Sequence, residues 1–337
     1  MGFIENIYKR VRGTKKKIIL PEGEELRVVK AVSHILERDL CIPVLVGDSD
    51  EILKISKDAN IDLKDVEIVD TKDYKNLDKY IKLYCEIRKH KGIKEEEAKS
   101  IIMQNPVFYS ALSVRAGDFD GFVAGAATTT RDVAKAAIYC IGPAKDTPTI
   151  SGFSIVILPD KNIGSKGVFI YADTGIIPDP NPTELRDIAI ASAKAARMLL
   201  DDEPRVAMLS YSTKGSGGAR GSVLKVREAT RLITEKEPDL LIDGEVQFDC
   251  AVVPEVAERK DPNSKIKGRA NVFIFPNLDA GNISYKLTER LAKAHIVGPL
   301  LQGLNRPASD LSRGCDTDDI VDAVAVTALR AQDNGEA

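Results

Sequence analysis

The chain has 337 residues, of which 43% are hydrophobic and 29% are charged, and its formal net charge is −3. This composition is typical of a globular protein and excludes a disordered chain. The balance of 48 basic against 51 acidic residues argues against a nucleic-acid-binding protein. At this length we expect two domains or one large one.

Cysteines and histidines give no sign of a metal centre. The five cysteines are far apart in the sequence, and there are three histidines. An odd number of scattered cysteines is typical of a reducing compartment. No apolar run reaches the roughly 18 residues of a membrane span, and the first residues lack the apolar core of a signal peptide. We therefore expect a cytoplasmic protein with no metal and no membrane partner.

Strands and helices alternate along the first 140 residues. Apolar runs predict strands at 17–20, 43–46, 66–69 and 121–124, with helices over 24–37 and 50–58, a helical charged stretch over 73–103, and another helix from Pro106. This alternation is typical of a mainly parallel sheet with helices on both faces.

The turn 125–130 follows a buried strand and precedes a helix expected over 131–141. It is rich in glycine and threonine, so its backbone N–H groups and the hydroxyls of Thr129 and Thr130 could cradle an anion. A simple strand-to-helix cap is the alternative, and the local sequence leaves both open.

Residues 142–148 form the best linker, and the pattern changes beyond it. Strands 153–158 and 168–171 are expected to pair, and a helix over 183–200 is expected to have Thr183 as its N-cap. Strands at 205–210, 239–242, 271–275 and 296–298 alternate with further helices.

The segment 211–222 is a second candidate phosphate loop. It lacks the order of a P-loop and of a dinucleotide fingerprint, but it follows a strand and combines hydroxyls, a lysine and glycines. This chemistry suits a multiply phosphorylated ligand, and the candidate contacts are Ser212, Thr213, Lys214, Gly215 and Ser216. A mobile surface loop is the alternative.

The stretch 304–329 carries the strongest candidate site. A polar loop ends in Ser312-Arg313-Gly314-Cys315, and an almost wholly apolar helix follows. Asp316 is expected to be its N-cap and Asp319 the acid of a capping box. Free N–H groups and the dipole favour an anion at this helix start. Alternatively, the two aspartates only cap the helix.

Several motifs resemble those of the phosphotransacetylase/phosphate butyryltransferase family. DLSRGC at 310–315 is similar to its signature, and the likeness extends through KIILPEGEELRVVKA, EIRKHKG, NPVFYSAL, GDFDGFVAG, YSTKGS, DGEVQFDCAVVPEVA and FPNLDAGNISYK. These motifs cover essentially the whole chain in order.

The resemblance implies an α/β fold of two domains, each a mainly parallel sheet flanked by helices, similar to the isocitrate/isopropylmalate dehydrogenase-like architecture. The first domain would comprise residues 1–146 and 300–337 and the second 147–299, with the active site in the cleft between them. The resemblance also implies a homodimer.

The implied reaction is reversible acetyl transfer between acetyl phosphate and coenzyme A in a ternary complex. Asp319 matches the family's catalytic aspartate and would be the general base, while Ser312 and Arg313 would hold phosphate or the developing oxyanion. Coenzyme A, acetyl phosphate and inorganic phosphate are the expected ligands. No tightly bound cofactor is expected, and stimulation by monovalent cations stays open.

Further substrate contacts follow from the same resemblance, which makes the loop 212–216 a possible contact for coenzyme A or phosphate. Arg88 matches a substrate-binding arginine, Lys135 stands where the family usually has arginine, and Ser309 stands where asparagine is often seen. Cys315 at a helix start is a tempting nucleophile, since such thiols tend to be acidic, but the family implies direct transfer with this cysteine near the substrate.

Two other functions compete with acetyl transfer. The first is transfer of a butyryl or propionyl group by the same chemistry. The second is an NADP- or metal-dependent hydroxyacid dehydrogenase, which needs a cluster of metal-binding aspartates and a dinucleotide contact region. Asp249 and the acids of 243–258 are the nearest candidates for the former. A scaffold protein that has lost its activity would have lost site residues that are present here.

Overall fold

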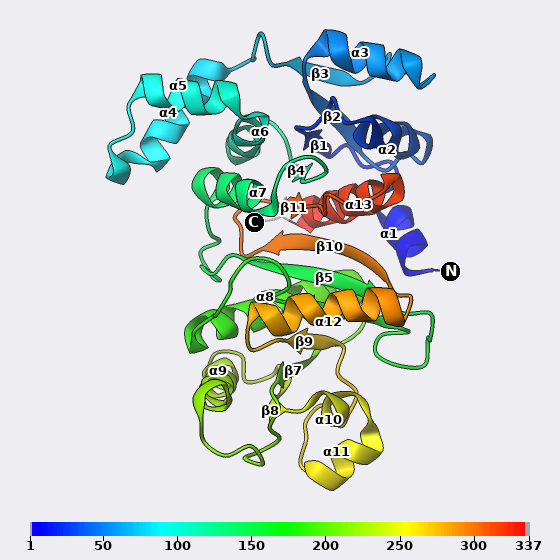
Figure 1. Cartoon of the computed structure of the whole chain (residues 1–337), viewed down its shortest axis with the longest axis vertical. Coiled ribbons are helices and arrows are strands. Elements are labelled where there is room, and N and C mark those ends of the chain that lie inside the picture. Colours follow the sequence, from blue (N-terminus) through cyan, green and yellow to red (C-terminus); the bar gives the residue numbers. More distant parts are fainter. Residues whose placement is uncertain (1, 334–337) are drawn as a thin grey trace. The chain divides into compact units, whose positions relative to one another are not determined.

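The computed structural model describes residues 2–333 and divides into two compact units (Figure 1). Unit 1 contains the chain up to Ala144 and from Leu304 onward, and unit 2 runs from Lys145 to Gly303. The expected cleft depends on how the two units are placed, and it stays a prediction.

The sheet of unit 1 is parallel. Its strands are β1 (Lys17–Leu20), β2 (Ile42–Gly47), β3 (Glu67–Asp70), β4 (Gly121–Ala124) and β11 (Ala308–Asp310). Their order is β3-β2-β1-β4-β11, and each neighbouring pair is parallel. Because the winding reverses between β1 and β4, the carboxyl ends of these strands mark the position where α/β sheets commonly bind ligands. The first four strands were predicted, whereas β11 was not.

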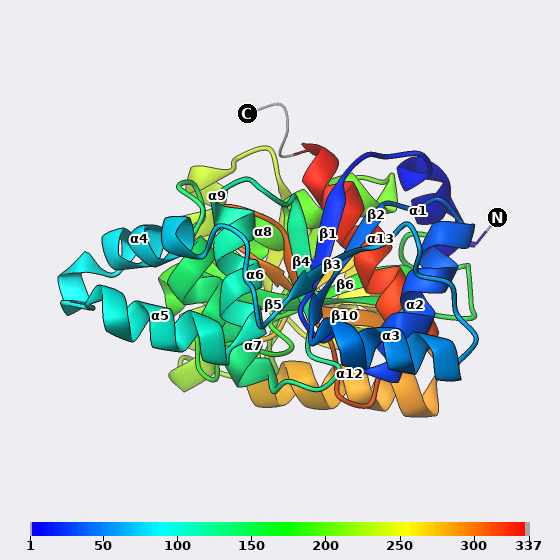
Figure 2. The same ribbon diagram turned by 90° about the horizontal axis from the view of Figure 1, so that it is seen from above.

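Unit 1 also contains helices, of which those over residues 77–104 project to one side of the sheet (Figures 1 and 2). The helices are α1 (Phe3–Val11), α2 (Leu26–Glu37), α3 (Ser49–Asp58), α4 (Leu77–Ile87), the short η1 (Lys89–Lys91), α5 (Glu95–Gln104), α6 (Pro106–Arg115), α7 (Thr130–Ala136), the π-helical η2 (Ala137–Ile141) and α13 (Thr317–Asp333). The helix expected over 131–141 is therefore divided into α7 and η2.

Helix α13 packs beside α1 and α2, and most of its circumference is buried, as its apolar sequence predicted. The Asp316 carboxylate accepts a hydrogen bond from the Asp319 N–H, and the Asp319 carboxylate accepts one from the Asp316 N–H, both at 2.9 Å. The predicted capping box is confirmed.

Unit 2 contains a mixed sheet. Its strands are β5 (Ser151–Ile157), β6 (Val168–Ala172), β7 (Arg205–Leu209), β8 (Leu241–Val246), β9 (Val272–Ile274) and β10 (His295–Gln302). The order is β10-β5-β6-β9-β7-β8, with the first two pairings antiparallel and the other three parallel. The expected pairing of β5 with β6 is confirmed.

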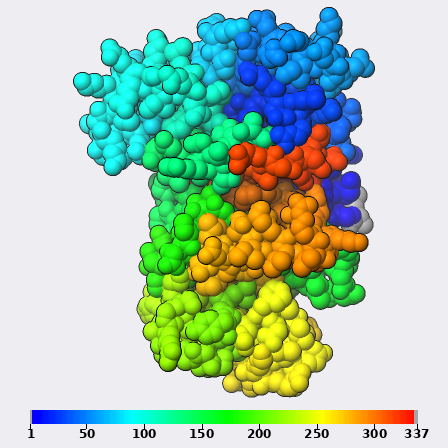
Figure 3. Space-filling model, viewed as in Figure 1, coloured from blue at the N-terminus to red at the C-terminus, as the bar shows by residue number. Residues whose placement is uncertain are grey.

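The helices of unit 2 are α8 (Pro182–Leu200), α9 (Gly221–Lys236), α10 (Phe248–Val252), α11 (Pro254–Lys260) and α12 (Leu278–Leu291). Helix α12 exposes Ile283, Leu287 and Leu291, which recur every four residues and so share one face; the helix lies open on the surface in Figure 3. Both units thus have the predicted α/β class. Among residues 2–333, no helix combines the length and the apolar character needed to cross a bilayer.

The start of α8 differs from the prediction. Asn181, not Thr183, is its N-cap: the Asn181 side chain accepts hydrogen bonds from the N–H groups of Thr183 and Glu184, and the Glu184 carboxylate accepts one from the Asn181 N–H. Pro182 occupies the first helical position, where its missing N–H costs nothing.

Replacing Asn181 by Ala removes this cap and should lower the free energy of unfolding by about 0.5–2 kcal/mol. Thr183→Ala is the matched control and should change it by less than about 0.5 kcal/mol, because the exposed Thr183 side chain does not cap the helix. Urea denaturation of both variants measures the difference. A larger loss of stability in Thr183→Ala than in Asn181→Ala would indicate that Thr183 is the N-cap after all.

Candidate active site

A buried carboxylate organises the carboxyl ends of β1 and β4. Glu22, which follows β1, is 9% exposed. Its Oε2 accepts the N–H groups of Gly125 and Ala126 at 2.9 and 2.8 Å, and its Oε1 accepts those of Ala127 and Thr128 at 3.0 and 2.7 Å. These four hydrogen bonds offset the cost of burying a charge.

The turn 125–130 is therefore an anion cradle, as its composition suggested, but its anion belongs to the chain itself. With the four N–H groups of 125–128 bonded to Glu22, they are not available to a substrate phosphate in this structure. Of the hydroxyls, that of Thr129 caps α7 by bonding to the N–H and carboxylate of Asp132. The role of Thr129 and Thr130 as substrate contacts stays a prediction.

Arg27 in the first turn of α2 connects this turn to the loop before α13. Its Nη2 donates to the carbonyl of Ala126 at 2.8 Å, and its Nη1 donates to the carbonyls of Arg313 and Cys315 at 3.0 and 2.7 Å. Its Nε is paired with Glu25 at 2.9 Å. Since these acceptors are spread over three segments, one guanidinium fixes the shape of the loop 312–315.

The predicted catalytic residues lie in this loop and at the start of α13. Ser312 and Arg313 are exposed, and the Ser312 hydroxyl accepts a hydrogen bond from the Gly314 N–H. Among the described residues, none forms a hydrogen bond or ion pair with the Arg313 guanidinium. Asp319 lies in the first turn of the helix, held by its bond to the Asp316 N–H.

Cys315 is poorly suited to attack a substrate. The residue is 6% exposed, and burial raises the pKa of its thiol to about 11. Arg27 opposes this rise, while Asp319, Glu22 and Asp316 add to it. Burial, with a smaller contribution from these carboxylates, thus outweighs Arg27, and the thiol is protonated at neutral pH.

Two other predicted residues meet at one aromatic ring. The Arg88 guanidinium lies over the ring of Tyr139 in η2, with 4.1 Å between its central carbon and the ring centroid, and the Lys135 Nζ lies 5.8 Å from the same centroid. The Arg88 Nε is buried without a hydrogen-bond partner among the described residues. Neither cation is paired with a described acid, so both charges remain open to an anionic ligand.

Ser309 lies in the core. It is fully buried in β11, and its hydroxyl is bonded to that of Thr327 in α13 at 2.6 Å. The predicted contact of Ser309 with phosphate is at odds with this position.

The predicted loop of unit 2 also encloses an internal carboxylate. Glu245 at the end of β8 accepts hydrogen bonds from the Ser212 hydroxyl and the Gly215 N–H, both at 2.8 Å, and pairs with Arg227 at 2.8 Å. Burial alone would raise the pKa of Glu245, but Arg227 and these donors lower it to about 2.

Lys214 in the same loop pairs with the buried Asp243 and lies 3.6 Å from Asp261. The Ser216 hydroxyl accepts the Thr213 N–H, and the Thr213 hydroxyl bonds Gln247. Most polar groups of the loop thus have partners within unit 2, and its contact with coenzyme A stays a prediction.

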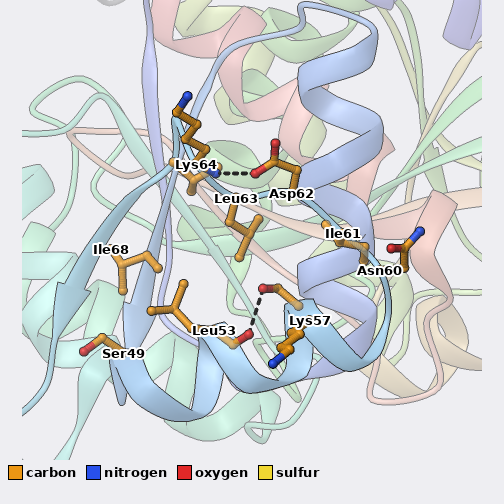
Figure 4. Close-up of a pocket in the computed structure, with 11 residues that line it drawn as sticks. Ser49, Leu53, Lys57, Asn60, Ile61, Asp62, Leu63, Lys64 and Ile68 are labelled. Carbon is orange, nitrogen blue, oxygen red and sulfur yellow. Dashed lines mark hydrogen bonds between the residues drawn. The ribbon is translucent and has the colours of Figure 1, made fainter.

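Two hollows of unit 1 do not coincide with the predicted residues. The larger, of about 750 Å³, is formed by α3 and the segment leading into β3, and its walls include Leu53, Leu63 and Ile68 (Figure 4). A second, of about 450 Å³, lies at the ends of β1 and β2, with Glu22 and Thr128 in its wall. Three carboxylates besides Glu22 line it, namely Glu24, Glu25 and Asp132.

Sequence reasoning missed Glu22 and Arg27. Both lie in the quoted motif KIILPEGEELRVVKA, but only the tertiary contacts show what they hold. A glutamate directly after a strand, in a protein with a glycine-rich turn after another strand, is a signal that could have indicated the pairing.

Comparison with known proteins gives consistent results. The family model described as phosphate acetyl/butaryl transferase matches residues 2–328. A phosphate acetyltransferase of Thermoanaerobacterium thermosaccharolyticum is 45% identical over 332 residues, which cover 98% of this chain and all of the relative. A solved phosphotransacetylase from Streptococcus pyogenes is 36% identical with a TM-score of 0.92, and 98% of each chain is covered.

A more distant likeness concerns the fold alone. A putative 4-hydroxythreonine-4-phosphate dehydrogenase from Salmonella typhimurium is 11% identical with a TM-score of 0.55, and the match covers 94% of this chain and 99% of the other. The predicted likeness to a dehydrogenase architecture is confirmed at this level.

Arg27→Ala should release the loop 312–315, because three backbone carbonyls lose their donor. Amide hydrogen exchange in the peptide spanning this loop should quicken by at least about tenfold, the effect of losing roughly 1.4 kcal/mol of local stability. Arg27→Lys keeps the charge but loses the forked donors, so the exchange rate of this peptide should lie between those of wild type and Arg27→Ala. Unchanged exchange in Arg27→Ala would contradict this role.

The Cys315 thiol should alkylate slowly at neutral pH and faster as the pH rises towards 11, because only the thiolate reacts. Iodoacetamide labelling followed by peptide mass spectrometry measures the rate, and Cys315→Ser identifies the labelled peptide. Labelling at pH 7 as fast as that of an activated cysteine would support the covalent alternative instead.

Proposed function

The chain belongs to the phosphate acetyl/butaryl transferase family, and we propose that it transfers an acetyl group reversibly between acetyl phosphate and coenzyme A. Relatives at 40–45% identity over nearly the whole chain are phosphate acetyltransferases. The chain is thus an acyltransferase, and the acetyl group, the mechanism and the residues below are our proposals.

The guanidinium of Arg313, which has no hydrogen-bond or ion-pair partner among residues 2–333, is the observation that carries this proposal. It lies beside Ser312 at the start of a buried helix, in a loop whose backbone is fixed by Arg27. A cation, a hydroxyl and the positive end of a helix dipole suit the phosphoryl group of acetyl phosphate and the negative charge that develops on it.

Asp319 is the proposed general base. A free thiol has a pKa near 8.5, so the thiol of coenzyme A must lose its proton as it attacks the acetyl carbonyl. The bond from the Asp316 N–H to Asp319 Oδ2 orients the carboxylate at the helix start. The thiolate then displaces phosphate directly, and the protonated Cys315 takes no covalent part.

Arg88 and Lys135 are the proposed contacts for the negatively charged parts of the substrates. Both charges flank Tyr139 and lack an acidic partner among the described residues. A lysine at position 135 provides charge without the two-pronged geometry of arginine. This difference keeps propionyl or butyryl transfer as the second candidate function.

Other parts of the proposal rest on the resemblance. We keep the loop 212–216 as a contact for coenzyme A, with Gly215 and Ser216 exposed at its tip. A homodimer is supported by the apolar face of α12, where Ile283, Leu287 and Leu291 are 56%, 52% and 79% exposed. We also propose that the enzyme acts in the cytoplasm without a tightly bound cofactor.

Asp319→Ala should lower kcat for thioester formation from coenzyme A and acetyl phosphate by about 10²–10⁴-fold, the usual contribution of a general base. Asp316→Ala is the matched control. It breaks the same capping box from the other side, so it should cost about 1 kcal/mol of stability and leave kcat within about threefold of wild type. Equal losses in both variants would reduce Asp319 to a helix cap.

A further inference from the structure

Asp310, the last residue of β11, is a buried acid that no proposed step uses. Its exposure is 0%, and neither carboxyl oxygen has a hydrogen-bond partner among the described residues. An unsatisfied buried polar group is costly and calls for an explanation. Its neighbour Ser309 points to α13, so Asp310 is on the opposite face of the strand.

The turn 125–130 forms the surroundings of this carboxyl. A side chain at position 125 would place its Cβ 2.6 Å from Asp310 Oδ1, so the close approach requires Gly125, whose φ is +117°. Glu22 holds the N–H of that same Gly125. Two buried carboxyl groups therefore share one turn.

The charged groups around Asp310 come from several elements. Glu22, after β1, raises the pKa of Asp310 through its charge. Thr130 of α7 and the Leu311 N–H lie close enough to Asp310 to lower its pKa in part, although neither has hydrogen-bond geometry. From α13, the half-buried Arg330 donates to the carbonyl of Ala308, which lies two residues before Asp310 in β11, at 3.3 Å.

Burial is the largest influence, and together these effects raise the pKa of Asp310 to about 7. Two adjacent carboxyl groups rarely ionise together in such a setting. Because Glu22 accepts four N–H bonds as a carboxylate, Asp310 is the partner that carries the proton.

We propose that Asp310 is a positioning residue of the acyl-transfer site, and that its neutral form keeps the turn 125–128 joined to the loop 312–315. This inference rests on the proposed function, since that loop carries Ser312 and Arg313. Asp310 touches no substrate and acts through the backbone around it.

The connection from Asp310 to the loop is short. The Leu311 N–H donates to the carbonyl of Ala124 at 2.8 Å, which fixes the chain just before Ser312. The turn itself binds the loop through Arg27, which bridges Ala126 and Cys315. A second negative charge at Asp310 would repel Glu22 and weaken the turn that supports both links.

The variant Asp310→Asn tests whether the neutral form of Asp310 positions the loop, because the amide has the same shape as the protonated carboxyl and never ionises. We would measure kcat/KM for thioester formation from coenzyme A and acetyl phosphate between about pH 5.5 and 8.5. The ratio of wild type to variant should fall as the pH rises through about 7, by about tenfold at pH 8, where roughly a tenth of Asp310 is still protonated.

Stability provides a readout that does not need activity. The pKa of Asp310 in the folded protein lies above the ordinary value of 3.8 for an aspartate, so the stability gained from the proton is lost as the pH rises from about 4 to about 7. The urea midpoint of Asp310→Asn should rise relative to wild type across this window. Asp322→Asn, which changes another buried acid of unit 1 bonded to Tyr8, is the control and should leave the activity ratio independent of pH.

The outcomes separate the two proposals. A flat activity ratio overturns the positioning role, even if the stability titration shows that Asp310 is protonated. No thioester from any form, with the expected stability titration, overturns the proposed function and leaves the proton on Asp310 established. If Asp310→Asn does not fold, the carboxyl carbon of Asp310 in the wild-type protein can be titrated by NMR, and a midpoint below about 5 overturns the proposal.

Discussion

The carboxylate of Glu22 holds two neighbouring strand ends of unit 1 together, and the candidate site depends on it. Its four N–H bonds shape the turn 125–128. That turn presents the carbonyl of Ala126 to Arg27, and Arg27 in turn fixes the backbone of Arg313 and Cys315. The exposed Ser312 and Arg313 are thus carried by a loop whose backbone contacts are internal, which is the rigid support that electrostatic catalysis requires.

Unit 2 uses the same arrangement independently. Glu245 at the end of β8 accepts donors from the loop after β7, and Arg227 neutralises it. In both units a glycine-rich turn after a strand binds an anion supplied by a neighbouring strand end. Backbone N–H groups attract a carboxylate as readily as a phosphate, so composition predicts that a turn binds an anion but not whether the anion is internal.

The sequence predicted the units' strands and helices well where hydrophobic periodicity was strong, and the capping box of Asp316 and Asp319 was confirmed. It missed β11, because three residues, Ala-Ser-Asp, give no periodic signal, and with that strand it missed Asp310. The alternation of faces along a strand would have separated Ser309 from Asp310 once β11 was known. Arg27 was out of reach, because its partners lie about 100 and 290 residues away along the chain.

The measurement that tests the account most directly is thioester formation from coenzyme A with acetyl, propionyl and butyryl phosphate in parallel. Rapid turnover that is fastest with acetyl phosphate is the predicted result, and it would establish both the reaction and the acyl group. A preference for butyryl phosphate would correct the acyl group and direct attention to Lys135. Absence of thioester with all three acyl phosphates would contradict the central claim.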